Sequence, residues 1–195
     1  MPELLCLEFV STVTWDGLEM VRDDQIRGYG QLLDWATERG VLRESDVDRL
    51  REEAAADPDA RRRALGRVWG FRRALHDCFR AVVRREQPPE ASIALINAVI
   101  ADAPPLFTLA PGADGIAFTI PAGPFPDPLQ AVLRSALHLL SSPDLERLRE
   151  CAAERCGRLY LDQTKNRSRR WCDMSTCGNR AKARRHQART RHPLP

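Results

Sequence analysis

The sequence lacks the long apolar run of a membrane-spanning helix. No uninterrupted apolar stretch approaches the ~20 residues that a bilayer requires. The first ten residues, MPELLCLEFV, also lack the basic side chains with which a secretory signal begins, and they contain Glu3 and Glu8 instead. We therefore expect a cytoplasmic protein with no membrane partner.

The sequence is equally poor in catalytic patterns. It contains no recognisable pair of nucleophile and base and no glycine-rich phosphate loop. His76 and His138 lie in segments with helical periodicity, where a structural histidine is more common than a catalytic one. A chain of 195 residues is nevertheless long enough to bury a core. We expect a globular protein without enzyme activity.

Lysine is scarce as well, with 2 residues against 28 arginines, so the abundance of arginine alone indicates no binding partner. Its distribution is more informative. Residues 151–195 contain 12 basic and 3 acidic residues, a net charge of +9, whereas residues 1–150 carry −6. Such an asymmetry indicates a polyanion-binding segment joined to a segment with another role. Because four of the six cysteines also lie in the basic segment, we expect two domains, 1–145 and 146–195.

The N-terminal domain shows mainly the periodicity of helices. Helices are expected over residues 30–42, 45–56, 58–88, 90–101 and 129–140, with Ser45 as the N-cap of the second. Residues 106–120 differ, because two β-prone runs flank PGADG, which predicts a β-hairpin. The segment after Ser142 fits either a new helix with Pro143 in its first turn or a strand. The predicted fold class is therefore α+β, with a mainly helical N-terminal domain.

Four cysteines have the spacing of a metal site. Cys151-x4-Cys156 is separated by fifteen residues from Cys172-x4-Cys177, and two such pairs can supply the four thiolates of a tetrahedral Zn²⁺ site. Iron–sulfur ligation and two disulfides are the alternatives. The arginine-rich surroundings favour structural zinc over a cluster, and disulfides suit secreted chains. We expect one structural zinc ion.

The residues between and after the cysteine pairs predict the shape of the finger. Leu159–Leu161 are strand-prone, residues 162–166 are turn-like, and residues 169–171 return to Cys172, which indicates a hairpin. The segment after Cys177 is rich in Ala and Arg and favours a helix. A knuckle, a hairpin and a helix whose first turn carries the last ligand together form a treble-clef finger.

The motifs of the basic segment resemble the CGNR zinc-finger family. They are Cys151-x4-Cys156-Gly157, Leu159-Tyr160-Leu161-Asp162, NRSRRWC at residues 166–172 and Cys177-Gly178-Asn179-Arg180. In that family the finger usually follows an ABATE domain, which is similar to this chain at LCLEFVST (residues 5–12), Leu32-Leu33-x-Trp35 and Arg134-Ser135-Ala136. The resemblance implies an α/β ligand-binding or regulatory domain fused to a DNA-binding finger, in a stress-linked transcription regulator. The family often has Asn where this chain has Ser11.

The basic segment predicts contacts with double-stranded DNA. Arg180, Arg184, Gln187 and Arg191 follow helical spacing and share one face of the last helix. The candidate DNA contacts are Lys165, Arg167, Arg169 and Arg170 in the turn, and Asn179, Arg180, Lys182, Arg184, Arg185 and Arg189 in the helix. Two alternatives stay open. Arg180 could instead pair with Asp162 or Asp173, and the finger could be an RNA-binding or protein-interaction module.

The N-terminal domain is expected either to sense a small-molecule effector or to form a homodimer. Glu8 is a candidate polar group of a ligand cavity, and Arg72 is a candidate partner for an anionic ligand. Ser11 joins them because of its place in the motif that resembles the ABATE family. Cys6 and Cys78 are expected to be small core residues. A redox-sensing pair is the alternative, for which two cysteines so far apart in the sequence give no spacing evidence.

Overall fold

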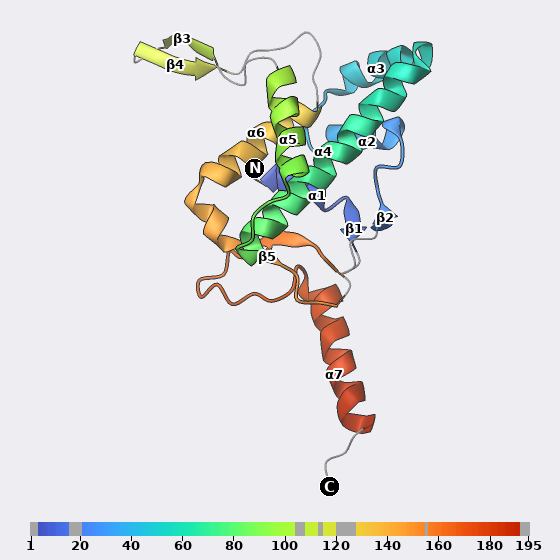
Figure 1. The fold of residues 1–195 in the computed structure, drawn as a ribbon. Helices are drawn as coiled ribbons and strands as arrows, with labels where there is room; N and C mark the ends of the chain where they lie inside the picture. Colours follow the sequence, from blue (N-terminus) through green and yellow to red (C-terminus); the bar gives the residue numbers. More distant parts are fainter. Residues whose placement is uncertain are drawn as a thin grey trace.

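The computed structural model describes residues 4–15, 21–103, 108–112, 115–119, 128–154 and 156–191. Helices make up most of the body (Figure 1). They are α1 Leu5–Val10, α2 Tyr29–Glu38, α3 Glu44–Ala56, α4 Pro58–Arg84, α5 Glu90–Asp102, α6 Pro128–Ser141 and α7 Asn179–Arg191. The long helix α4 contacts α1, α3 and α5, and α6 packs on α1. The structure thereby confirms the expected helical character of the N-terminal part.

The ends of α4 follow from its sequence. Asp57 caps the N-terminus by accepting a hydrogen bond from the backbone N–H of Ala60, and Pro58 occupies the first turn, where its missing N–H costs nothing. Arg85 ends the helix in the left-handed conformation, with φ of 59°. The helix therefore stops before Pro88, and its buried face, which includes Phe71 and Phe79, lies at the centre of the core.

The described residues also contain three antiparallel strand pairs. They are β1 Val13–Trp15 with β2 Val21–Asp24, β3 Thr108–Gly112 with β4 Gly115–Thr119, and β5 Leu148–Glu150 with β6 Leu159–Leu161. The β3–β4 pair is the hairpin expected over residues 106–120, and Gly112 pairs with Gly115 at its turn. Helices with small antiparallel strand pairs confirm the α+β class.

Two local expectations were wrong. Ser45 is not an N-cap, because α3 begins at Glu44 and no side chain caps it. The strand at Leu159–Leu161 does not pair with residues 169–171 but with β5, which precedes the first cysteine pair. Strand propensity at 159–161 is local information, and it does not specify which segment supplies the partner.

The segment after α6 contains both structures that its sequence fits. A 3₁₀ helix, η2 (Pro143–Arg147), is capped by Ser142, whose hydroxyl accepts a hydrogen bond from the backbone N–H of Asp144. The chain then enters β5 directly. The expected boundary at residue 145 therefore falls within η2.

The β5–β6 ribbon packs into the same core as the N-terminal helices. Leu148 and Leu159 are each 2% exposed and belong to one hydrophobic cluster with Phe9 and Phe71. Both ribbon strands contact α4. At the edge of this interface, Arg84 donates to the carboxylate of Glu150. Residues on either side of the expected boundary thus share one core.

The turn before β6 approaches the N-terminal part closely at Gly157. This residue has φ of 59°, and a Cβ there would lie 3.0 Å from the Cβ of Trp15. The Nε2 of His76 donates to the carbonyl oxygen of Gly157, and the imidazole stacks on the Trp15 indole with centroids 4.6 Å apart. A larger residue at position 157 would be strained by the positive φ and would also clash with Trp15.

Across the described ranges, which begin at residue 4 and end at residue 191 with internal gaps, no helix is long and apolar enough to cross a bilayer.

The shared core predicts the effect of shortening Leu148. The Leu148→Ala substitution should lower the free energy of unfolding by about 2–5 kcal/mol, because it opens a cavity between α4 and the ribbon. The loss should appear in urea unfolding followed by helical circular dichroism. Leu140→Ala on the exposed side of α6 is the control and should cost less than ~1 kcal/mol. An unchanged helical transition in Leu148→Ala would show that the ribbon does not stabilise the helices.

Candidate metal centre and nucleic-acid interface

Four segments bring the cysteines together. Cys151 follows β5, and Cys156 lies in the knuckle before β6, where the backbone N–H of Cys151 bonds to the Arg158 carbonyl. Cys172 ends the loop that follows β6. Cys177 lies in a π-helical turn, η3 (Met174–Gly178), which runs directly into α7. The four sulfur atoms all lie within 4.8 Å of one another.

The sulfur separations match a single tetrahedral ion. The Sγ atoms of Cys156, Cys172 and Cys177 are 3.7 Å from one another. Zinc–sulfur bonds of about 2.3 Å place the sulfurs of a tetrahedral site about 3.8 Å apart. A disulfide of about 2.05 Å would be much shorter, and all four cysteines are free. The four cysteines can therefore hold one zinc ion, as the spacing predicts.

The thiols themselves favour a cation. The four thiols share one negative charge more readily than several: hydrogen bonds with Cys156 and Cys172 lower the pKa of Cys151, whereas the hydrogen bond with Cys151 raises the pKa of Cys172 and raises that of Cys156 to about 11. A divalent ion reverses this effect because it binds the deprotonated thiolates. The backbone N–H of Cys172 also donates to the sulfur of Cys151 over 3.3 Å, which stabilises negative charge there.

Each residue after Cys177 in the CGNR motif has a structural role. Arg180 donates to the Cys177 sulfur over 3.1 Å, and Asn179 donates from its side-chain amide to the Ser175 carbonyl over 2.9 Å. Gly178 is buried beneath Met174, whose sulfur would lie 3.0 Å from a Cβ at position 178. The motif therefore fixes the last ligand at the start of α7.

Two aspartates hold the loops that carry the ligands. Asp173 caps η3, and hydrogen bonds from Ser175 and Thr176 lower the pKa of its carboxyl to about 2. Asp162 is fully buried, which alone would raise its pKa, but hydrogen bonds from Thr164 and the Arg169 backbone lower it. Both carboxylates therefore accept hydrogen bonds from residues of their own loops.

Arg169 also serves the loop between β6 and Cys172. Its guanidinium donates to the carbonyls of Trp171 and Cys172 and lies over the Tyr160 ring, 4.8 Å from the centroid. The Tyr160 hydroxyl donates in turn to the Arg169 carbonyl over 2.7 Å. Trp171 is half-buried against the cysteine cluster and belongs to the finger's small apolar core.

Two family models match the chain along its length. The model of the CGNR zinc finger matches residues 147–190, and that of ABATE, described as "Putative stress-induced transcription regulator", matches residues 3–143. The chain belongs to the ABATE family. The two matches confirm the predicted order of an ABATE segment followed by a CGNR finger, and neither family is an enzyme family. The search of curated proteins found no match.

The predicted DNA contacts of the CGNR finger fall into two groups. Lys165, Arg167, Arg170, Lys182 and Arg184 have exposed side chains. Arg167 pairs with Glu146 over 3.2 Å, and Arg184 pairs with Glu154. Asn179, Arg180 and Arg169 are exposed as well, but their side chains contact the loops and sulfur of the metal site, as described above. Arg180 pairs with neither Asp162 nor Asp173. Arg185 and Arg189 belong to α7, but their side chains lie outside the described part.

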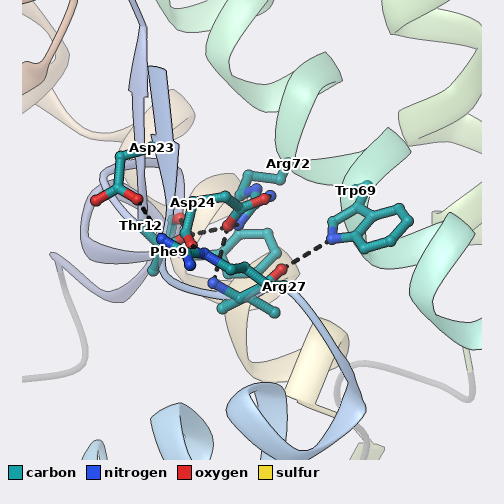
Figure 2. A network of polar contacts seen from close by, with 8 residues as sticks. Phe9, Thr12, Asp23, Asp24, Arg27, Trp69 and Arg72 are labelled. Carbon is teal, nitrogen blue, oxygen red and sulfur yellow. Dashed lines mark hydrogen bonds and ion pairs between the residues drawn. The ribbon is translucent and has the colours of Figure 1, made fainter. Parts of the chain in front are cut away.

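The three candidate ligand residues of the ABATE segment do not meet at one place. Glu8 and Ser11 line a pocket of about 390 Å³ between α1 and the finger. Arg72 is buried elsewhere, where it donates to the Asp24 carboxylate and to the Thr12 hydroxyl and lies near the Phe9 ring (Figure 2). Its guanidinium is therefore part of an internal ion pair that joins β2 to α4.

Sequence reasoning missed two partners at the pocket. Arg39 forms a 2.6 Å ion pair with Glu8, and Arg158 donates to the carbonyl oxygen of Ser11 over 3.3 Å. The two residues of each pair are 31 and 147 positions apart in the sequence, so a local sequence pattern cannot predict these contacts.

The metal centre predicts a specific zinc content. The purified chain should contain one zinc ion, and Cys172→Ser should reduce the content to near zero because it removes one of four ligands. Elemental analysis of the folded protein measures this. Cys78→Ser, which changes a buried cysteine outside the cluster, is the control and should keep its zinc. Iron in place of zinc would contradict the assignment.

The contact between Arg180 and Cys177 predicts a second effect. Arg180→Gln should weaken zinc binding by about 10–100-fold, the usual cost of removing a partner of a metal ligand. Competition with a chromogenic chelator gives the affinity. Lys182→Gln removes the same charge from an exposed position of the same helix and should leave the affinity unchanged. Equal affinities in the two variants would show that Arg180 does not support the metal site.

Proposed function

We propose that this chain is a zinc-dependent transcription regulator that binds double-stranded DNA through its CGNR finger. The observation that carries the proposal is the position of α7, which projects away from the helical body (Figure 1). A helix of 13 residues is about 20 Å long and can lie in the major groove of DNA. Four thiolates and Zn²⁺ contribute −2, so the segment of net charge +9 keeps about +7.

The finger carries two clusters of exposed basic side chains that can contact DNA. Lys182 and Arg184 are exposed on the projecting helix, and Lys165, Arg167 and Arg170 are exposed on the loop before Cys172. The pairs of Arg167 with Glu146 and of Arg184 with Glu154 are exposed on both sides. Such surface pairs contribute about 0–1 kcal/mol, so phosphates can replace the carboxylates. A knuckle, a ribbon and a ligand-bearing helix support a treble-clef arrangement.

The ABATE segment supplies regulation in this proposal. Its net charge of −6 over residues 1–150 disfavours contact with phosphates, so sensing an effector or joining two copies suits it better than binding DNA. A DNA partner agrees with the cytoplasmic location expected from the sequence. We assign no catalytic activity to this segment.

A module that binds single-stranded RNA is the second candidate. The Arg170 guanidinium lies over the Trp171 ring, 5.4 Å from the centroid, and an arginine stacked on an aromatic ring can accept an unpaired base. Trp171 is half-buried, however, which leaves little of its face for a base. DNA binding therefore remains the better supported function.

Salt dependence and charge reversal test the DNA proposal together. With six or more phosphate contacts, affinity for duplex DNA should fall by about 10³-fold or more between 50 and 200 mM salt. Arg184→Glu/Arg185→Glu should weaken binding by at least about 10-fold without loss of zinc, because it reverses two charges on α7. Fluorescence anisotropy with duplexes selected from a random pool gives the affinities.

The matched control reverses two adjacent arginines of the ABATE segment. Arg62→Glu/Arg63→Glu changes the net charge equally at exposed positions near the start of α4 and should bind DNA as the unmodified chain does. An equal loss of DNA affinity in both double variants would show that binding depends on net charge alone and not on α7. Stronger binding to single-stranded RNA than to any duplex would favour the second candidate.

A further inference from the structure

We propose that the pocket between α1, α2 and the finger binds a small organic anion, and that its occupancy is linked to the docking of the finger; this rests on the regulatory function proposed above. The pocket has a volume of about 390 Å³, within the range of small-molecule sites. Its walls come from both matched segments. Glu8, Ser11 and Arg39 belong to the ABATE segment, and Arg158 and Arg169 belong to the finger.

The charges of the residues that line the pocket determine whether it favours an anion or a cation. Three arginines, Arg39, Arg158 and Arg169, line the pocket against one carboxylate, that of Glu8. Glu8 and Arg39 neutralise each other across 2.6 Å. Apart from the metal ligand Cys172, the other two arginines leave an excess of positive charge in the lining. The negative charge of the zinc–thiolate centre is shared among four sulfur atoms, of which one belongs to the pocket, so the lining still favours an anion.

Arg158 is the arginine best placed to hold the anion. Its side chain is exposed, and within the described residues its guanidinium makes a long 3.3 Å hydrogen bond to the Ser11 carbonyl. The remaining N–H groups of its planar fork match the two oxygens of a carboxylate or phosphate. Arg169, by contrast, already donates to the Trp171 and Cys172 carbonyls.

The rest of the wall favours an organic rather than an inorganic anion. Leu4, Leu7, Leu159 and Leu161 contribute apolar surface to the lining. Trp35 also lines the pocket and is 6% exposed, yet its indole N–H has no hydrogen-bond acceptor among the described residues. The indole nitrogen itself is fully buried, so Trp35 contributes apolar ring surface to this wall, and its N–H lies close enough to report on what occupies the pocket.

The composite wall makes binding depend on the finger. In the sequence, Arg158 lies between the zinc-binding residue Cys156 and the core residue Leu159. Cys172, another zinc-binding residue, lines the pocket. The complete pocket exists only when the ribbon is docked on the helices. A ligand that contacts both segments therefore stabilises the docked arrangement, and the same linkage lets it change the affinity of the finger for DNA.

Benzoate titrated into the zinc-loaded full chain tests the site. The indole N–H of Trp35, identified in ¹⁵N spectra by its absence in Trp35→Phe, should shift with saturation at concentrations up to about 20 mM, enough to fill a site with a Kd of about 1 mM. Benzamide, which has the same shape without the charge, should bind at least about 10-fold more weakly. Phenyl phosphate and acetate serve as the phosphate and non-aromatic anion probes.

Arg158→Gln should weaken benzoate binding by at least about 10-fold. Arg61→Gln, at an exposed position of α4 that does not line the pocket, removes the same charge and should leave it unchanged. The proposal is wrong if none of the three anions gives a saturable shift, if benzamide binds as well as benzoate, or if both arginine variants bind benzoate equally.

The linkage to DNA has its own readout. Saturating benzoate should change the affinity for duplex DNA by at least about threefold in the unmodified chain and leave that of Arg158→Gln unchanged. If benzoate binds but leaves the affinity for DNA unchanged, the linkage is wrong and the anion site stands. Benzoate binding by a chain that binds no duplex would overturn the proposed function and leave the site intact, since Arg158 is not among the proposed DNA contacts.

Discussion

The repulsion among four closely spaced thiolates is the constraint on which the finger depends. Thiolates whose sulfur atoms all lie within 4.8 Å of one another repel each other unless a cation binds them, and the small apolar cluster around Tyr160 and Trp171 is too limited to hold the loops alone. The metal therefore supplies the folding free energy, on the order of 10 kcal/mol for structural zinc. Arg180 adds positive charge at the sulfur of Cys177, which ties the orientation of α7 to the metal.

A second constraint connects the finger to the helices. Leu148 and Leu159 of the β5–β6 ribbon are buried in the cluster that contains Phe9 and Phe71, and Gly157 lies against Trp15. The metal thus fixes one end of the ribbon while the hydrophobic core fixes its apolar face. Because close-packed interfaces transmit displacement, a change at the helices can reach the base of α7 through the ribbon.

Local patterns in the sequence predict local structure well. The cysteine spacing identifies the metal ligands, the apolar periodicity identifies the long helix, and PGADG identifies the β3–β4 hairpin. Contacts between distant residues were not predictable in this way. The partner of Leu159–Leu161, the ion pair between Asp24 and Arg72, and the meeting of Ser11 with Arg158 all depend on how the helices pack. Pairing of Arg180 with Asp162 or Asp173 was an open alternative to DNA contact, but the sequence does not show that the Cys177 sulfur competes for the same guanidinium.

The burial of the ribbon also bears on how such a protein is inherited. A small finger with a self-contained core can be joined to many different partners by recombination. Here the apolar face formed by Leu148 and Leu159 is completed by side chains of α1 and α4, so a finger transferred alone would expose it to water. Selection should therefore keep the ABATE segment and the CGNR finger in one gene, and substitutions on the two sides of the ribbon should accumulate as compensating pairs.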